Sequence, residues 1–259
     1  MNVLDVMGVS RRYGGVFAVR DVTMSVAEGE LRGVIGPNGA GKSTLFSLIS
    51  GHSRPDAGTV TYRGAPLDRL APHRRAAEGI AIVFQGARLF RGMSALENVM
   101  VGAHCWTRHG FLAAALRLPR HRREEREIRA EAADALDRVG LSARAADRAE
   151  ALPLGQQRSL QLARALCSRP RLLLLDEPAS GLRAGERHAL SDLVGRLHAR
   201  GLTMMLIEHD VGFVTGLADR ITALHLGRVI AEGTPAEVAR DERVVTAYLG
   251  GRAGHAGGR

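Results

Sequence analysis

Cysteine, lysine and long apolar runs are scarce in this 259-residue sequence, and each shortage narrows what the protein can be. Two cysteines, Cys105 and Cys167, cannot build a disulfide framework, so we expect reduced thiols. The longest apolar runs, such as residues 172–175, are far shorter than the ~20 residues that a membrane-spanning helix needs. Residues 1–5 lack the basic and apolar regions of a signal peptide. Together these absences predict a cytoplasmic protein.

Lysine is the scarcest charged residue: lysine and arginine together number 36, and Lys42 is the only lysine. The formal net charge of +9 is compatible with a nucleic acid or an anionic membrane surface as partner. The arginines are, however, spread along the chain, and 45% hydrophobic with 24% charged residues is an ordinary globular composition. Because the planar fork of arginine cannot replace a compact ammonium inside a phosphate-binding loop, Lys42 is the first candidate functional residue.

The order of apolar runs, turns and helical periodicity predicts an α/β protein. β-rich stretches come first and form an antiparallel layer, and strands then alternate with helices in the βαβ rhythm of a parallel sheet. We expect strands over residues 3–9, 16–26, 31–35, 59–62, 80–84, 171–175, 203–207 and 220–224, and helices over 42–50, 155–168, 184–200 and 210–218.

A charged helical region interrupts this α/β core. Residues from about 94 to 150 are helical in pattern, with Pro119 as an interior break, and together with the following helix they form an insert over about 94–168. The whole is predicted to be one domain over residues 3–249. A glycine-rich tail follows, residues 250–259, which we expect to be flexible and disordered.

A complete phosphate-binding loop lies between an expected strand and an expected helix. The pattern G-x-x-x-x-G-K-[ST] is matched in full by Gly36, Pro37, Asn38, Gly39, Ala40, Gly41, Lys42, Ser43 and Thr44. The glycines let the backbone curl, so that successive N–H groups converge on phosphate oxygens at the start of a helix. Lys42 is expected to bridge the β- and γ-phosphates of ATP, and the Ser43 hydroxyl to ligate Mg²⁺.

Two adjacent carboxylates follow the apolar residues 172–175. Such a run is typical of a buried parallel strand, and the carboxyl end of a parallel strand is where α/β sheets bind ligands. Asp176 is placed to hold Mg²⁺, directly or through water. Glu177 is placed to polarise the attacking water, a role worth about 10²–10⁴ in rate. The sequence therefore predicts a Mg-dependent ATPase.

With these motifs the chain resembles the ATPase subunits of ATP-binding-cassette (ABC) transporters, over about residues 3–249. The distinctive segment opens a helix upstream of the carboxylate strand and consists of Leu152, Pro153, Leu154, Gly155, Gln156 and Gln157. It is similar to the family's signature motif, usually Leu-Ser-Gly-Gly-Gln. Gly155 and Gln156 match, whereas Pro153 replaces the serine and Leu154 the first glycine. In the family this helix start caps the γ-phosphate bound to the partner subunit. The resemblance implies either a phosphate contact made by backbone N–H groups or the weaker half of an asymmetric pair.

Further positions match the family one at a time. Tyr13 matches the aromatic residue that stacks on adenine. Gln85 matches the glutamine that senses magnesium and water and links to the membrane subunit, and His209 matches the histidine that contacts the γ-phosphate. Arg183 stands where the family usually has an aspartate that serves communication across the dimer. The resemblance thus assigns catalysis to Glu177, His209 and Gln85, and magnesium binding to Ser43, Gln85 and Asp176.

More particular strings point to one branch of the family. The stretch GRVIAEGTPAEV at residues 227–238, the switch region Ile-Glu-His-Asp at 207–210 and the long insert near 104–130 are similar to the LivG-type ATPase subunits of branched-chain amino acid importers. This resemblance implies ATP and Mg²⁺ as cofactors and a second, similar ATPase subunit whose site each signature completes in trans. It also implies two membrane permease subunits and an external substrate-binding protein. The chain would then sit at the cytoplasmic face of the cell membrane, held by the permeases.

Other functions stay open at the level of the sequence. Import of urea or other amides and export of lipid or polysaccharide use the same motor with different membrane subunits. A soluble ABC ATPase acting on DNA or ribosomes would suit the net charge of +9, but such proteins usually carry paired cassettes, long coiled coils or metal sites. We therefore expect no nucleic acid partner. Pro153 and Arg183 motivate a cassette that binds ATP without hydrolysing it, although the loop lysine, both carboxylates and the switch histidine are present.

Overall fold

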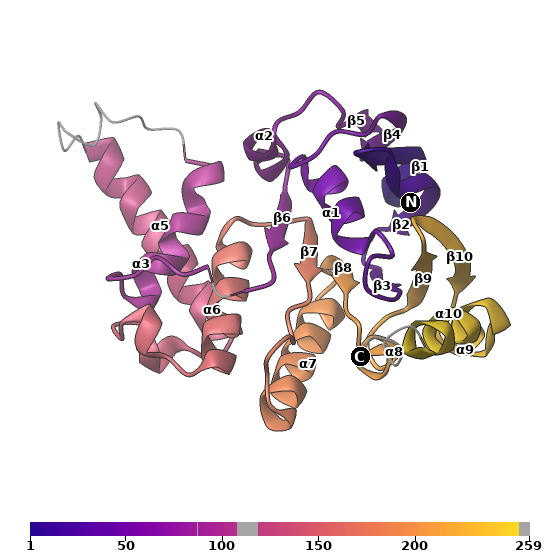
Figure 1. Cartoon of the computed structure of the whole chain (residues 1–259). Coiled ribbons are helices and arrows are strands. Elements are labelled where there is room, and N and C mark those ends of the chain that lie inside the picture. The colour runs from indigo at the N-terminus through magenta and orange to yellow at the C-terminus, as the bar shows by residue number, and fades with distance from the viewer. Residues whose placement is uncertain (87, 108–118, 254–259) are drawn as a thin grey trace.

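The computed structural model describes residues 1–86, 88–107 and 119–253, which form two sheets and a helical lobe (Figure 1). The first sheet is antiparallel and contains, in spatial order, β2 (Val16–Ala27), β1 (Asn2–Tyr13), β4 (Ala57–Tyr62) and β5 (Ala65–Pro66). Gly14 and Gly15 join β1 to β2 with φ of 53° and 94°. Positive φ at both central residues is what a tight two-residue hairpin requires, so the glycine pair fixes this turn.

The second sheet carries the candidate site. Its spatial order is β10 (Arg228–Gly233), β9 (Arg220–His225), β3 (Leu31–Ile35), β8 (Thr203–Ile207), β7 (Leu172–Asp176) and β6 (Ile80–Val83). The strands from β9 to β6 pair in parallel, and β10 pairs antiparallel to β9. Every residue of β3 and β8 is buried, as expected for parallel strands covered on both faces.

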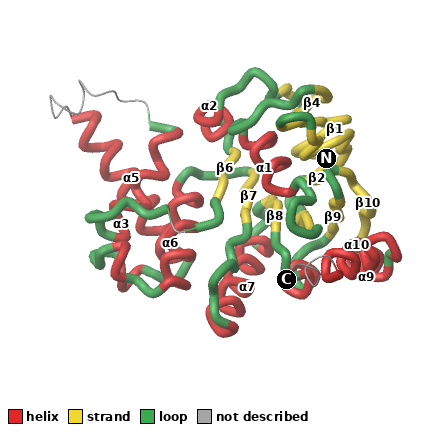
Figure 2. Tube along the Cα trace, viewed as in Figure 1, coloured by secondary structure: helices red, strands yellow, loops and turns green. Residues whose placement is uncertain are grey.

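The helices divide between this sheet and the helical lobe. The lobe is built by α3 (Ala95–Met100), α5 (Pro119–Arg138) and α6 (Leu154–Cys167), which pack on one another. Figure 2 shows this lobe on one side of the molecule and the strands on the other. The remaining helices are α1 (Lys42–Ser50), α2 (Pro72–Ala77), α7 (Ala184–Ala199), α8 (Val211–Thr215), α9 (Pro235–Arg240) and α10 (Glu242–Ala253), and the 3-10 helices are η1 (Val101–Cys105), η2 (Ser142–Arg144) and η3 (Ala149–Ala151).

Two apolar clusters form the core, one on each face of the parallel sheet. Because successive strand residues point to opposite faces, Leu173 and Leu175 of β7 join the cluster that includes α6 and α7. Leu172 and Leu174 join the cluster that includes α1 and the antiparallel sheet. The sheet therefore holds both layers in place, and its carboxyl edge is the fixed frame on which the site residues stand.

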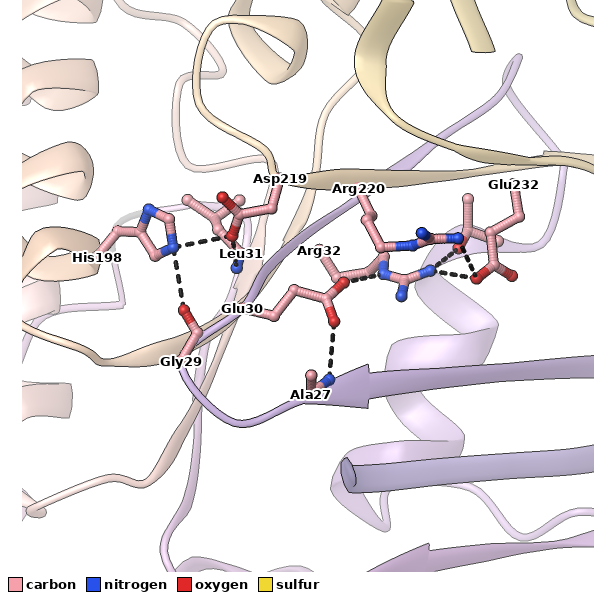
Figure 3. A network of polar contacts seen from close by, with 10 residues as sticks. Ala27, Gly29, Glu30, Leu31, Arg32, His198, Asp219, Arg220 and Glu232 are labelled. Carbon is pink, nitrogen blue, oxygen red and sulfur yellow. Dashed lines mark hydrogen bonds and ion pairs between the residues drawn. The ribbon is translucent and has the colours of Figure 1, made fainter. Parts of the chain in front are cut away.

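A polar network anchors β3 at the end opposite to the phosphate-binding loop (Figure 3). Arg32 is 2% exposed and pairs with Glu30 and, at 2.6 Å, with Glu232 of β10. Beside it, Asp219 Oδ2 accepts a hydrogen bond from the N–H of Leu31 at 2.8 Å and lies 2.9 Å from His198 Nε2. These contacts tie β3 to β10 and α7, and so fix the strand that leads into the loop.

The predicted fold class is confirmed, while several details differ. Pro119 is the first residue of α5 instead of an interior break, which is the helix position where a missing N–H costs least. The helix expected over 210–218 spans only Val211–Thr215. α10 continues to Ala253 into the predicted tail, whose residues 254–259 lie outside the described part of the chain, as do residues 108–118 of the insert. Both cysteines are free, and among the described residues no helix has the length and hydropathy to cross a membrane.

Candidate active site

The phosphate-binding loop leaves the carboxyl end of β3 and enters α1, whose first residue is Lys42. The Lys42 side chain is almost fully buried, and its Nζ donates to the carbonyls of Gly36 at 2.7 Å and Pro37 at 3.1 Å. Two glycines make this curl possible. A Cβ on Gly36 would lie 2.2 Å from the carbonyl oxygen of Leu224, and Gly41 has φ of 102°. The backbone carbonyls of the loop thus hold the ammonium group of Lys42.

Asp176 lies at the carboxyl end of β7, beside β8. Burial raises the pKa of its carboxyl, and the charge of Glu177 raises it further. Lys42 and a hydrogen bond from the Ser43 hydroxyl act in the opposite direction. The Ser43 and Asp176 oxygens, which the sequence places 133 positions apart, are therefore neighbours at the start of α1.

Glu177 follows with a left-handed backbone, φ of 45°, which is unfavourable for a residue with a side chain and recurs at functional sites. Its N–H donates to the carbonyl of Ile207 at 3.0 Å, which holds the chain in this sharp turn. Its Oε2 accepts a hydrogen bond of 2.7 Å from Nε2 of Gln85 and lies 4.0 Å from Nδ1 of His209. The three residues expected to be catalytic are thus brought together from the ends of β6, β7 and β8.

A further carboxylate, Glu208, lies in the same place and was not singled out from the sequence. It is 1% exposed, burial raises its pKa, and its Oε1 accepts a hydrogen bond of 2.8 Å from the N–H of Ala179. Its Oε2 lies 3.6 Å from Nδ1 of His209. The sequence could have indicated Glu208 as a site residue, because it follows an apolar strand in the same way as Asp176 and Glu177 do.

The charges of the site are balanced around the single lysine. Burial lowers the pKa of Lys42, and the carboxylates of Glu177 and Asp176 oppose this change. Lys42 is thus a buried cation with the acidic side chains of Asp176 and Glu177 near it at the carboxyl end of the sheet.

Comparison with known proteins identifies the family. Residues 19–180, more than half of the chain, match the family model described as ABC transporter. The chain belongs to the ABC transporter family of ATPases. Residues 228–254 also match a model described as branched-chain amino acid ATP-binding cassette transporter.

Relatives of this ABC protein span almost its whole length. BraF of Pseudomonas aeruginosa, a high-affinity branched-chain amino acid transport ATP-binding protein, is 39% identical and covers 96% of this chain and 98% of its own. LivG of Escherichia coli, with the same description, is 38% identical over the same shares. A nucleotide-free ATP-binding cassette of known structure superposes with a TM-score of 0.83 at 29% identity, covering 96% of this chain and 99% of its own. The sequence-based assignment to the ABC family and its LivG-like branch is confirmed, and the family implies ATP hydrolysis.

The signature segment of this ABC protein opens α6 in the helical lobe. Pro153 is the residue before the helix and provides no side-chain cap, and Leu154 is exposed. The N–H of Gly155 donates to Oε1 of Glu186 at 3.1 Å, so an acidic residue of α7 caps the helix start. Gln157 reaches back to the carbonyl of Leu152 at 2.8 Å, and Gln156 Oε1 is buried without a hydrogen-bond partner among the described residues. These residues do not join the group formed by Lys42 and the carboxylates.

Tyr13, the expected adenine-stacking residue, ends β1 and is half exposed. Its hydroxyl lies 3.2 Å from Ser53 Oγ, and this hydrogen bond lowers its pKa. The guanidinium of Arg11 lies 4.9 Å from the centre of its ring. These contacts place Tyr13 beside Ser53, beyond the end of α1.

Residues of α6 connect the elements around the site. Gln161 Nε2 donates to the carbonyl of Gly86 at 2.7 Å, next to Gln85. Arg158, which is 6% exposed, donates to the carbonyl of Ser180 at 3.2 Å, in the segment that follows Glu177. The helix that carries the signature thus touches the backbone on both sides of the Gln85–Glu177 hydrogen bond.

Proposed function

We propose that this chain is the ATP-hydrolysing subunit of a membrane importer for branched-chain amino acids, working with a second ATPase subunit. The observation that carries the proposal is the meeting of Gln85, Glu177 and His209 beside the phosphate-binding loop. The substrate class is supported by the branch-specific match over residues 228–254 and by the descriptions of BraF and LivG.

The loop binds the triphosphate of ATP. Backbone N–H groups from Gly39 to Thr44 surround the phosphates, and Lys42 places its ammonium between the β- and γ-phosphates. Ser43 and Asp176 offer hard oxygen ligands, which fit Mg²⁺. This ion binds few carboxylates and takes its other ligands from phosphates and water. When bound there, Mg²⁺ would neutralise charge that develops on the phosphate oxygens. Tyr13 stacks on adenine in this proposal.

Hydrolysis is assigned to Glu177. Its carboxylate polarises a water molecule that attacks the γ-phosphorus, and the bond from that phosphorus to the oxygen shared with the β-phosphate breaks. Gln85 holds Oε2 of Glu177 through a hydrogen bond of 2.7 Å, which fixes the direction of the carboxylate. His209 is more than half exposed, and in this proposal its side chain turns from the carboxylates of Glu177 and Glu208 toward the γ-phosphate.

A second ATPase subunit completes each site. Residues 152–157 open α6, which belongs to the helical lobe, whereas Lys42 opens α1, which lies outside the lobe (Figure 1). One chain therefore carries the two halves of a site apart, which supports a pair of chains arranged head to tail. A related cassette of known structure, 26% identical with a TM-score of 0.75 and covering 90% of this chain and 98% of its own, is described as dimeric. Pro153 has no hydroxyl to offer a phosphate, and Glu186 occupies the N–H of Gly155, so a phosphate contact of this signature would need the other N–H groups at the start of α6.

A groove beside Gln85 is the surface we assign to a permease subunit. It has a volume of about 690 Å³ and lies between α2, β6, η1 and α6. Its walls include Phe84, Arg88 and Phe90, and the guanidinium of Arg88 lies 4.6 Å from the centre of the Phe84 ring. Because Gln85 lies between Phe84 and Gly86, movement of a helix seated in the groove would reach the Gln85–Glu177 hydrogen bond.

Glu177→Gln tests the hydrolytic role. The amide keeps the size of the side chain and removes the charge that polarises water, so turnover of Mg-ATP should fall by about 10²–10⁴ while ATP still binds. Glu28→Gln, an exposed carboxylate in the turn before β3, is the matched control and should leave turnover unchanged. Turnover of the Glu177→Gln protein at the wild-type rate would overturn the assignment, and activity without Mg²⁺ would overturn the metal requirement.

Uptake measurements test the transported substrate. Deleting the gene for this chain should abolish high-affinity uptake of radiolabelled leucine, isoleucine and valine, and the wild-type gene but not the Glu177→Gln gene should restore it. A relative at 33% identity is described as a lipopolysaccharide export ATP-binding protein, from Acidithiobacillus ferridurans, and it covers 96% of this chain and 97% of its own. Unchanged amino acid uptake together with a defect in the cell envelope would therefore favour export over import.

A further inference from the structure

The turn that carries Glu177 is held through its backbone N–H groups. It spans residues 177–180, directly after β7, and Glu177 has φ of 45°. A residue with a side chain keeps such a left-handed conformation only where its surroundings hold it there. The N–H of Glu177 donates to the carbonyl of Ile207 at 3.0 Å, and the N–H of Ser180 donates to the carbonyl of Glu177 at 3.2 Å. Backbone carbonyls therefore accept two of the hydrogen bonds that shape the turn.

A side chain accepts the remaining one. Pro178 has no N–H, and the N–H of Ala179 donates to Oε1 of Glu208 at 2.8 Å. Glu208 directly follows β8, the strand that pairs with β7, and it is 1% exposed. Ala179 is buried as well, so without this oxygen its N–H would be left unpaired away from water. The Glu208 carboxylate thus fastens the turn to the end of the neighbouring strand.

The second oxygen of Glu208 faces the catalytic group. Oε2 of Glu208 lies 3.6 Å from Nδ1 of His209, and Oε2 of Glu177 lies 4.0 Å from the same nitrogen. The Glu177 side chain is held by Gln85 Nε2 at 2.7 Å. Gln85 therefore fixes the carboxylate end of Glu177, whereas the hydrogen bond from Ala179 to Glu208 fixes the backbone behind it.

We propose that Glu208 is a positioning residue for ATP hydrolysis, whose Oε1 holds the turn after β7 and thereby aims the carboxylate of Glu177 at the attacking water. A hydrogen bond from an N–H needs only an acceptor oxygen, so this role does not depend on the charge of Glu208. The inference rests on the hydrolytic role proposed above for Glu177.

Two variants separate the acceptor oxygen of Glu208 from its size. Glu208→Met keeps the length of the side chain and removes both oxygens. In steady-state hydrolysis of Mg-ATP by the full-length chain, kcat should fall about 10- to 100-fold, the range for one buried donor left unpaired. KM for ATP should stay within about 2-fold, because the contacts of the phosphate-binding loop are untouched. Glu208→Gln keeps a carbonyl oxygen for Ala179 and should retain kcat to within about 3-fold of the wild type.

Thr203→Val is the matched control at the opposite end of β8. Thr203 is 2% exposed, and its Oγ1 accepts a hydrogen bond of 2.9 Å from the N–H of Gly29. Valine keeps the size of the side chain and removes the oxygen, so this variant also takes the acceptor from a backbone N–H, but far along the strand from Glu177. Its kcat should equal that of the wild type.

Combining Glu208→Met with Glu177→Gln tests the route of the effect. If Glu208 acts through Glu177, the double variant should turn over ATP within about 2-fold of Glu177→Gln alone. Wild-type kcat for Glu208→Met, an equal loss for Thr203→Val, or a fully additive double variant would overturn the inference. A loss of about 10-fold or more in Glu208→Gln would do so as well, even where Glu208→Met does not fold. Wild-type turnover of the Glu177→Gln protein would instead overturn the hydrolytic assignment, and this inference with it.

Discussion

A methionine at position 75 would keep most of the apolar stem of the Arg75 side chain and remove its guanidinium. Arg75 lies on α2, is 1% exposed, and donates to four backbone carbonyls. Two of them, Leu48 at 2.6 Å and Ile49 at 2.8 Å, belong to the last turn of α1, the helix that follows the phosphate-binding loop. The others are Leu67 at 2.8 Å and Leu70 at 2.9 Å. Among the described residues no carboxylate forms an ion pair with it, so its charge is balanced by carbonyl dipoles.

The magnitude follows from these contacts. A hydrogen bond from a charged donor contributes about 1.5–3 kcal/mol, so four would give at most about 6–12 kcal/mol. The desolvation of the guanidinium offsets part of this stabilisation, and the same burial lowers the pKa of Arg75. Removing the guanidinium leaves the Leu48 and Ile49 carbonyls without their cation at a helix end where negative partial charge gathers. We expect Arg75→Met to cost about 3–5 kcal/mol, the range for removing one partner of a buried charged contact.

Urea unfolding measures this cost as a lower midpoint at an unchanged m value. Arg74→Met is the matched control, because Arg74 is the exposed neighbour on the same helix, and it should change stability by no more than about 0.5 kcal/mol. Arg75→Lys should fall between the two, since an ammonium has three donors instead of five. A loss below about 1 kcal/mol for Arg75→Met would refute the idea that this guanidinium fastens α1.

Asp176→Asn should raise the melting temperature of the nucleotide-free protein at pH 7 while abolishing Mg-ATP hydrolysis. Burial and Glu177 raise the folded-state pKa of Asp176 above its unfolded value, so ionisation opposes folding at neutral pH, and the gain should vanish as pH falls below about 4. Thermal unfolding of both proteins across this pH range tests the expectation. A variant with a lower melting temperature than the wild type at pH 7 would contradict it. Arg32→Met should cost about 3–5 kcal/mol in urea unfolding, because it leaves Glu30 without its cation and Glu232 with only Arg220, 3.7 Å away, and adding Glu30→Gln should recover part of the loss. An unchanged midpoint for the single variant would show that the network in Figure 3 adds nothing.

The parts of the site that are local in sequence could be predicted. The loop from Gly36 to Thr44 is one continuous segment, and its sequence pattern predicts its backbone conformation. The apolar run over residues 172–175 predicts the position of Asp176 and Glu177 at the end of a buried strand. The hydrogen bond between Gln85 and Glu177 joins residues 92 positions apart, and it follows only once β6 and β7 are known to be neighbours. The resemblance to the family indicated both residues, whereas the pairing of β6 with β7 brings Gln85 Nε2 to within 2.7 Å of Glu177 Oε2.

The elements after residue 225 were missed for a physical reason. β10 is a short edge strand. In the turn that leads into it, Leu226 and Gly227 have φ of 46° and 77°, and a leucine in the sequence does not predict a positive φ. α9 did carry a signal, because Thr234 and Glu237 form a capping box around Pro235 at the start of the helix. Arg75 carried none: arginine is mostly exposed, and its burial depends on four carbonyls that come together only in the fold.

The use of lysine and arginine in this chain follows the shape of what each cation binds. The three arginines that are buried in the described part of the chain each spread their donors: Arg32 over two carboxylates, Arg75 over four carbonyls, and Arg158 over Gln161 and the Ser180 carbonyl. The only lysine occupies the loop, where two carbonyls surround one compact ammonium. Because the net charge of +9 counts these enclosed cations equally with surface ones, it overstates the positive charge available to a polyanion. The buried Glu30 and Glu208 offset two of these enclosed cations among the described residues, so the exposed part of the chain still carries a net positive charge.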